Sequence, residues 1–207
     1  MKNPNKEIIV GDKVFTPSKI VCIGRNYHAH IDELGNETPE QMVIFIKPNS
    51  AVSSTLTAYH QEQLHYEGEL CFLVDKNKLA AVGFGLDLTK RTLQGSLKAK
   101  GLPWERAKAF DGSALFSGFV EITEVSAGLA FELAINGETV QVGNLELMIH
   151  KPQEILSEIL TFMTLYDGDI LMTGTPMGVG VINNDDVFTA VVKDHDKIII
   201  KETWVAD

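Results

Sequence analysis

The sequence predicts a β-rich α+β fold, because strand-like segments outnumber helical patterns along the chain. The strongest signal is a hairpin in which residues 129–135 and 139–142 flank Asn136-Gly137. Asn-Gly readily supplies the two positive-φ positions of a type I′ turn. At 207 residues and 44% apolar, the chain can bury one core. We therefore expect a single domain over residues 1–207, with a hairpin within residues 1–18 as part of it.

Strands are predicted along the whole chain by short apolar or alternating runs bounded by turn residues. Near the start, two short runs joined at Gly11-Asp12 form the expected hairpin. The expected strands are residues 7–10, 13–15, 19–23, 42–46, 66–74, 81–86, 169–173, 187–192 and 197–204, besides the hairpin above.

Three helices are predicted from helical spacing and from end signals. A short helix over 27–34 ends at Gly35, and a second over 89–100 starts at a threonine cap, Thr89. The clearest pattern runs from Pro152 to residue 166, where proline suits the first turn.

The net charge of −10 argues against a nucleic-acid or anionic-membrane partner, since those surfaces repel an acidic protein. No apolar run approaches the ~20 residues that span a bilayer, and the first residues lack a secretion signal. Cys22 and Cys71 lie in apolar segments, which is typical of reduced, buried thiols. We expect a cytoplasmic protein. A local cationic pocket for a small anion remains compatible with the composition.

Two glutamates one residue apart, Glu67 and Glu69, are the most informative feature of the chain. In a strand they share a face, with Cα atoms about 7 Å apart, opposite the face of Tyr66, Leu70, Phe72 and Val74. Asp87 ends the next apolar run, so pairing of the two runs would gather three hard oxygen ligands suited to Mg²⁺ or Mn²⁺. The alternative is an exposed strand face that carries acids without a metal.

His30 and Glu33 are three residues apart on the first predicted helix and so are neighbours on one face. A carboxylate beside an imidazole fixes its tautomer and favours its protonated form, as a general base acting on water requires. The alternative is a solvated polar helix with an incidental His/Glu pair.

Two further segments have both a functional and a plain structural interpretation. Lys108 follows the second helix in a small-residue stretch and is either a cation aimed at an anionic substrate or a surface lysine. The glycine-rich segment 173–180 is either a carboxylate-binding loop or an ordinary tight loop. It lacks the phosphate-loop pattern, which excludes a nucleotide site of that kind.

Taken together, these segments resemble the fumarylacetoacetate hydrolase family, specifically its compact, acylpyruvase-like members. The resemblance runs from about residue 20 to about 192 and includes Gly24-Arg25-Asn26-Tyr27, the two glutamates, Leu86-Asp87-Leu88-Thr89 and Lys108-Ala109-Phe110. It implies a mixed β-sandwich or roll with a few short helices. It also implies Mg²⁺ or Mn²⁺ on Glu67, Glu69 and Asp87, with Ca²⁺ able to substitute in a crystal.

The resemblance also implies roles for other residues. His30 and Glu33 would activate water, with Lys108 as a further catalytic residue. The implied substrate-binding residues are Arg25, Tyr27, Lys47, Gln94 and Thr175. Thr92 and Leu115 depart from the family pattern and are expected to reshape the substrate pocket. Family members usually dimerise, so a homodimer is expected.

The function implied is metal-dependent hydrolysis of a C–C bond in a small, anionic acylpyruvate-type 3-oxo acid through a stabilised enolate. The same enolate chemistry leaves two other reactions open: oxaloacetate decarboxylation, and keto–enol or double-bond isomerisation of the 2-hydroxyhepta-2,4-diene-1,7-dioate type. A relative that binds metal and oxo acid without turnover is the non-enzyme alternative.

Overall fold

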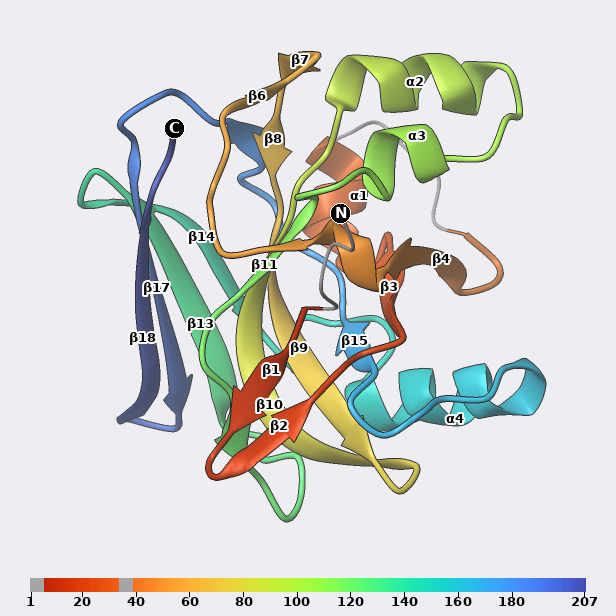
Figure 1. Cartoon of the computed structure of the whole chain (residues 1–207), viewed down its shortest axis with the longest axis vertical. Helices are drawn as coiled ribbons and strands as arrows, with labels where there is room; N and C mark the ends of the chain where they lie inside the picture. Colours follow the sequence, from red (N-terminus) through yellow and green to blue (C-terminus); the bar gives the residue numbers. More distant parts are fainter. Residues whose placement is uncertain (1–5, 34–38) are drawn as a thin grey trace.

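The computed structural model describes residues 6–33 and 39–207, and its strands form two main sheets (Figure 1). The first runs in the order β4 (Val43–Pro48), β3 (Lys19–Gly24), β15 (Ile170–Met172), β9 (Gly68–Asp75), β10 (Lys78–Asp87), β11 (Ala114–Phe116) and β5 (Val52–Ser53), with β12 (Val120–Glu121) paired to β10. The second runs β14 (Glu138–Asn144), β13 (Leu129–Ile135), β17 (Val187–Asp194) and β18 (Lys197–Val205). This architecture confirms the predicted β-rich α+β fold.

Short elements surround the two sheets. Three two-stranded pairs are β1 (Ile8–Val10) with β2 (Lys13–Phe15), β16 (Gly180–Val181) with β8 (His65–Tyr66), and β6 (Tyr59–His60) with β7 (Glu62–Gln63). The helices are α1 (His28–Glu33), α2 (Arg91–Ala99), α3 (Glu105–Lys108), α4 (Pro152–Phe162) and the 3₁₀ turn Asn49–Ala51. Figure 1 shows α2 and α3 together at one end of the molecule and α4 beside β15.

The predicted hairpins form. Asn136 and Gly137 have φ values of 53° and 87°, as a type I′ turn between β13 and β14 requires. The N-terminal pair joins at Gly11-Asp12 as expected. The prediction of one domain over residues 1–207 stays a prediction.

Helix ends differ from the sequence expectations. Helix α4 stops at Phe162 rather than residue 166, because Met163 is extended and the Tyr166 N–H donates to Asp169 instead of continuing the helix. Thr89 does not cap α2; its hydroxyl accepts a hydrogen bond from Lys108. Glu62 accepts the Thr92 N–H in its place. Gly35 lies outside the described residues.

The core has two parts, and this corrects one expectation. Tyr66, Leu70, Phe72 and Val74 do face one large cluster, which includes apolar side chains from the second sheet. However, the opposite face of β9 is buried too. Its Cys71 packs in a second cluster that includes Ile8 and Val10 of β1 and Ile20 and Cys22 of β3. The acids at the head of β9 are therefore on a buried face, not a solvated one.

Two sequence-based statements about the chain's environment can be compared with the fold. Cys22 and Cys71 are buried and form no disulfide, as predicted. Within the described ranges, no helix is long and apolar enough to cross a bilayer.

Candidate active site

The three predicted metal ligands come together where β9 and β10 pair. Glu67 precedes β9, Glu69 lies on it, and Asp87 ends β10. The strands are antiparallel, and the Asp87 N–H donates to the Glu67 carbonyl at 2.8 Å. One oxygen from each carboxylate lies within 4.8 Å of the others, and all three residues are buried. The expected pairing of the two segments is confirmed.

Gly68, between the two glutamates, makes room for a side chain from the second sheet. A Cβ at this position would lie 2.9 Å from Gln141 Oε1 and 2.9 Å from the Phe84 ring. The Gly68 N–H donates to that oxygen at 2.9 Å, and Gln141 Nε2 donates to Thr175 Oγ1 at 2.9 Å. Gln141 thus ties the carboxylate strand to the glycine-rich loop.

The surroundings of Glu69 and Glu67 shift the pKa values of the two carboxyl groups in opposite directions. Burial raises the pKa of Glu69 well above its usual range, and the charges of Asp87 and Glu67 raise it further, against one hydrogen bond from the Gly174 N–H. Burial also acts to raise the pKa of Glu67, but the cations of Lys108 and Arg91 outweigh it and hold that pKa below its usual range.

Lys108 is buried at the end of α3 and joins two of the carboxylates. Its Nζ lies 2.8 Å from Glu67 Oε2 and 2.7 Å from Asp87 Oδ2, and it donates to Thr89 Oγ1 at 2.7 Å. Burial lowers its pKa, but Asp87 and Glu67 more than offset this, so the net shift is upward. The surface-lysine interpretation is therefore wrong.

Two more cations contact the cluster. Lys47 is fully buried, its Nζ lies 2.8 Å from Asp87 Oδ1, and it also donates to the Lys108 carbonyl. Arg91 pairs with Glu67 and donates to Gln94 Oε1 at 2.9 Å. Each acid–base contact compensates part of the cost of burying charge.

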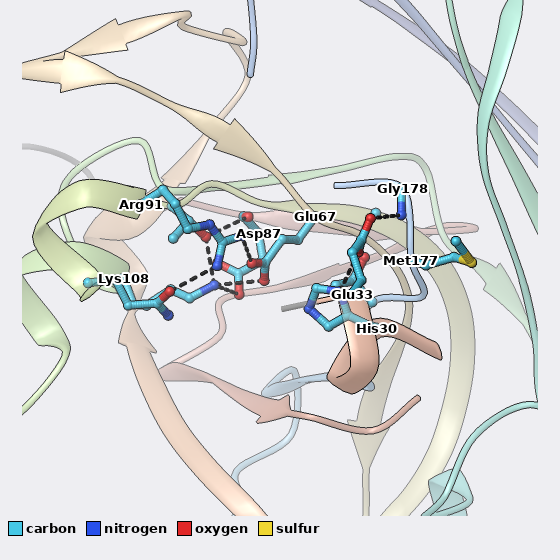
Figure 2. A network of polar contacts seen from close by, with 12 residues as sticks. His30, Glu33, Glu67, Asp87, Arg91, Lys108, Met177 and Gly178 are labelled. Atoms are coloured by element: carbon cyan, nitrogen blue, oxygen red, sulfur yellow. Dashed lines mark hydrogen bonds and ion pairs between the residues drawn. The ribbon is translucent and has the colours of Figure 1, made fainter. Parts of the chain in front are cut away.

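His30 and Glu33 stand opposite this cluster. His30 Nδ1 lies 3.1 Å from Glu33 Oε2, and Glu33 Oε1 accepts the Gly178 N–H at 3.0 Å. Figure 2 shows this pair on one side, with Glu67, Asp87 and their cations on the other. His30 is only 5% exposed, so its helix is not simply solvated. A carboxylate only accepts hydrogen bonds, so Nδ1 carries the proton and Nε2 is left as the basic atom.

His30 and Glu67 both line one small cavity of about 30 Å³, whereas Glu33, Glu69 and Asp87 are not on its wall. The predicted site residues on its wall are Arg25, His30, Glu67, Gln94, Lys108 and Thr175. Lys47 and Tyr27 are not on this wall. The Lys47 ammonium group contacts Asp87 instead, and the Tyr27 hydroxyl donates to the Asn144 carbonyl at 3.4 Å. Substrate binding by these two residues stays a prediction.

Several residues of the site were not predicted. Thr89 was expected to cap a helix, but its hydroxyl contacts Lys108. Its position two residues after Asp87 is the sequence signal that could have placed it in the site. Lys98 and Trp104 line the cavity without any distinguishing sequence pattern. The departures at Thr92 and Leu115 are not on the wall: Thr92 is exposed at the start of α2, and Leu115 is fully buried in the core. The expectation that they reshape the pocket is not supported by their positions.

The donor set fits a hard divalent cation. Three buried carboxylates offer only oxygen, and their mutual repulsion at Glu69 is the condition that a cation relieves. Glu67, Glu69 and Asp87 would hold Mg²⁺ or Mn²⁺, as the resemblance implied. Their roles as ligands stay predictions.

Comparison with known proteins now identifies the chain. Residues 19–203 match the model of the fumarylacetoacetate (FAA) hydrolase C-terminal family. The chain belongs to the fumarylacetoacetate hydrolase family. It is 37% identical to the oxaloacetate tautomerase YcgM of Escherichia coli (strain K12), over 86% of this chain and 90% of that protein. It is 38% identical to the mitochondrial oxaloacetate tautomerase FAHD1 of Arabidopsis thaliana, over 84% and 85%.

Solved structures of the family share the fold. A crystal structure of an Oleispira antarctica protein matches with a TM-score of 0.92 and 32% identity, covering 98% of this chain and 100% of that one. Fumarylpyruvate hydrolase of Pseudomonas aeruginosa, solved in complex with Mn²⁺ and pyruvate, matches with a TM-score of 0.88 and 27% identity, covering 100% and 97%. The chain is therefore similar in sequence to proteins named oxaloacetate tautomerases and similar in fold to a protein named fumarylpyruvate hydrolase.

Proposed function

We propose that this family member is a divalent-metal-dependent tautomerase that interconverts the keto and enol forms of a small 2-oxo dicarboxylate such as oxaloacetate. The observation that carries the proposal is that His30, paired with Glu33, shares a cation-lined cavity with Glu67 of the three-carboxylate cluster. The two curated relatives compared above, both named oxaloacetate tautomerases, support the choice of reaction.

Charge supports a dianionic substrate. The three carboxylates are already matched by Lys47, Lys108 and Arg91, each in direct contact with the cluster. A bound divalent cation would leave about two positive charges in excess on this cluster, before the Glu33 carboxylate and the Arg25 and Lys98 cations are considered. A dicarboxylate dianion balances that excess better than a monoanion does. The substrate expected from sequence, a small anionic oxo acid, is retained in this narrower form.

The chain's own residues have separate tasks in this reaction. A metal held by Glu67, Glu69 and Asp87 would supply Lewis-acid stabilisation of negative charge on the enolate oxygen. His30, held by Glu33, takes a proton from the carbon beside the oxo group and delivers it to the enolate oxygen; in the reverse direction it moves the proton from oxygen back to carbon. Gln94, Arg25 and Thr175 hold the substrate carboxylate. The proton that leaves carbon is gained by oxygen, so no atom is gained or lost.

The test is the decay of enol-oxaloacetate followed by ultraviolet absorbance, with product analysis. With Mg²⁺ we expect accelerated conversion without release of pyruvate, inhibition by EDTA, and loss of most turnover in His30→Ala. Formation of pyruvate from oxaloacetate would instead show a decarboxylase. Binding of oxaloacetate without any acceleration would support the non-enzyme alternative.

Hydrolysis of an acylpyruvate-type acid is the second candidate. The fold shared with a fumarylpyruvate hydrolase favours it, and the same His30–Glu33 pair suits activation of water. Incubation with acetylpyruvate and with fumarylpyruvate distinguishes the two, since hydrolysis releases pyruvate and a second acid. A 2-hydroxy-dienoate in the same panel tests double-bond isomerisation. A homodimer and a cytoplasmic location stay predictions.

A further inference from the structure

The inner face of α2 carries a cation that the proposed chemistry does not use. Lys98 lies four residues after Gln94, so the two side chains share a helix face. Both residues line the cavity that Glu67 and His30 also line. Lys98 therefore has access to a ligand in that cavity.

Aromatic rings position the Lys98 ammonium group. Its Nζ lies 4.7 Å from the centroid of the Trp104 ring, within the range of a cation–π attraction. Trp104 packs in turn against Phe45, with ring centroids 6.1 Å apart, and both aromatic residues line the cavity. The cation is thus held at the cavity wall rather than extended into solvent.

No carboxylate in the described part of the chain lies within ion-pair distance of Lys98. The two neighbouring cations differ in this respect, because Arg91 and Lys108 both pair with Glu67. Lys98 thus supplies positive charge that the described acidic side chains do not neutralise by direct contact.

The surroundings of Lys98 favour an incoming anion. Burial and the cation of Lys108 lower its pKa to about 8, with Arg25 and Arg91 acting in the same direction and Glu67 against them. A carboxylate placed beside the ammonium group would favour its protonated form. The energetic cost of crowding these cations is therefore relieved when an anionic group binds.

We propose that Lys98 binds the remote carboxylate of the substrate and makes the enzyme select dicarboxylates over monocarboxylates. Gln94, Arg25 and Thr175 receive the 2-oxo acid end beside the metal that the acids would hold. Lys98 on α2 receives the other end. This inference rests on the proposed function for the identity of the substrate class, and it adds a specificity-determining residue.

The test uses malate and lactate, two 2-hydroxy acids that differ in the remote carboxylate. Binding to the Mg²⁺-loaded protein is measured by calorimetry at pH 7. In Lys98→Met we expect malate affinity to fall at least tenfold while lactate affinity stays within twofold. Lys98→Arg should restore malate binding and keep it above pH 8, where the unmodified protein loses its preference as Lys98 deprotonates. Lys100→Met, an exposed lysine at the end of the same helix, is the matched control and should change neither affinity.

Three results would overturn the inference: an equal loss of malate and lactate affinity, no loss of malate affinity in Lys98→Met, or no preference for malate in the unmodified protein. Failure of the proposed function is distinguishable. If the protein does not tautomerise oxaloacetate but Lys98→Met still removes the malate preference, the binding role stands and the assigned reaction falls. If the protein does tautomerise oxaloacetate but Lys98→Met leaves the preference for diacids intact, the assigned reaction stands and the binding role of Lys98 falls.

Discussion

Glu33 joins the imidazole of His30 to the backbone of Gly178, with one carboxylate oxygen at 3.1 Å from Nδ1 and the other accepting the Gly178 N–H at 3.0 Å. Helix α1 is thereby fixed to the loop after β15 (Figure 2). His30, the proposed general base, is consequently oriented by a contact between segments 145 residues apart in the sequence.

Glu33→Gln should lower kcat by about 100-fold or more. An amide at this position can donate to Nδ1, which would place the proton on Nε2 and remove the basic atom. Glu33 acts through His30, so the expected pattern is a large loss of kcat with little change in KM or in the Mn²⁺-induced stabilisation. Glu105→Gln, at an exposed position of α3, is the control. A loss of metal affinity in Glu33→Gln would assign it a structural role instead.

Gly178→Ala should damage both stability and turnover. Gly178 has a φ of +95°, and an added Cβ would lie 2.1 Å from the Val140 carbonyl oxygen. The backbone strain alone costs about 1–3 kcal/mol, and the shifted loop withdraws the N–H that Glu33 accepts. Gly118→Ala is the matched control, since open space surrounds its position. Chemical unfolding and steady-state kinetics would reveal the difference, and equal behaviour of the two variants would contradict it.

Glu69→Gln should affect thermal stability differently with and without bound metal. Without metal the thermal midpoint should rise or stay unchanged, because burial and the charges of Asp87 and Glu67 already disfavour an ionised Glu69. At free Mn²⁺ of 100 times Kd, the unmodified protein should gain about 2.7 kcal/mol, or roughly 5–10 °C. The variant should lose most of that gain, whereas His30→Ala should keep it. A full Mn²⁺ response in Glu69→Gln would remove this residue from the ligand set.

Asp169 should make stability dependent on acid pH. Its carboxylate accepts from the Ser18 and Tyr166 N–H groups and from Lys19 Nζ at 2.6 Å, joining the starts of β3 and β15. Burial acts to raise its pKa, but these hydrogen bonds outweigh that and hold the pKa below its ordinary value. The stabilisation is therefore complete above the ordinary pKa of about 4 and is lost as pH falls through the lower folded value.

Asp169→Asn should accordingly lose about 2–4 kcal/mol of unfolding free energy at pH 7. The difference from the unmodified protein should shrink steadily below pH 4. Urea unfolding of both proteins at several pH values checks this. A difference that stays constant down to pH 2 would contradict the assigned cause.

Local signals in the sequence predicted much of the fold and the identity of the acids. The turn at Asn136-Gly137, the alternation around the two glutamates and the apolar run before Asp87 are encoded by neighbouring residues, so strand pairing followed from them. The pairing of β9 with β10 needed only a short connection, and it brought Asp87 to the glutamates. Resemblance to a family then supplied the roles that spacing alone left open.

Long-range packing determined what the sequence did not reveal. The depth of Lys108 depends on α3, a four-residue helix without a strong pattern, and Lys47 reaches Asp87 from β4. Gln141 contacts Gly68 across 73 residues. Such contacts arise from how the sheets and helices pack, and no periodicity within either segment encodes them.

The central claim is that one divalent cation is held jointly by Glu67, Glu69 and Asp87. Crystals grown with Mn²⁺ and oxalate, and measured near the manganese absorption edge, test it directly. We expect one anomalous peak about 2.0–2.2 Å from an oxygen of each carboxylate, with oxalate between the ion and the His30 side of the cavity. A peak that lacks any of the three carboxylates, or that lies elsewhere in the molecule, would contradict it.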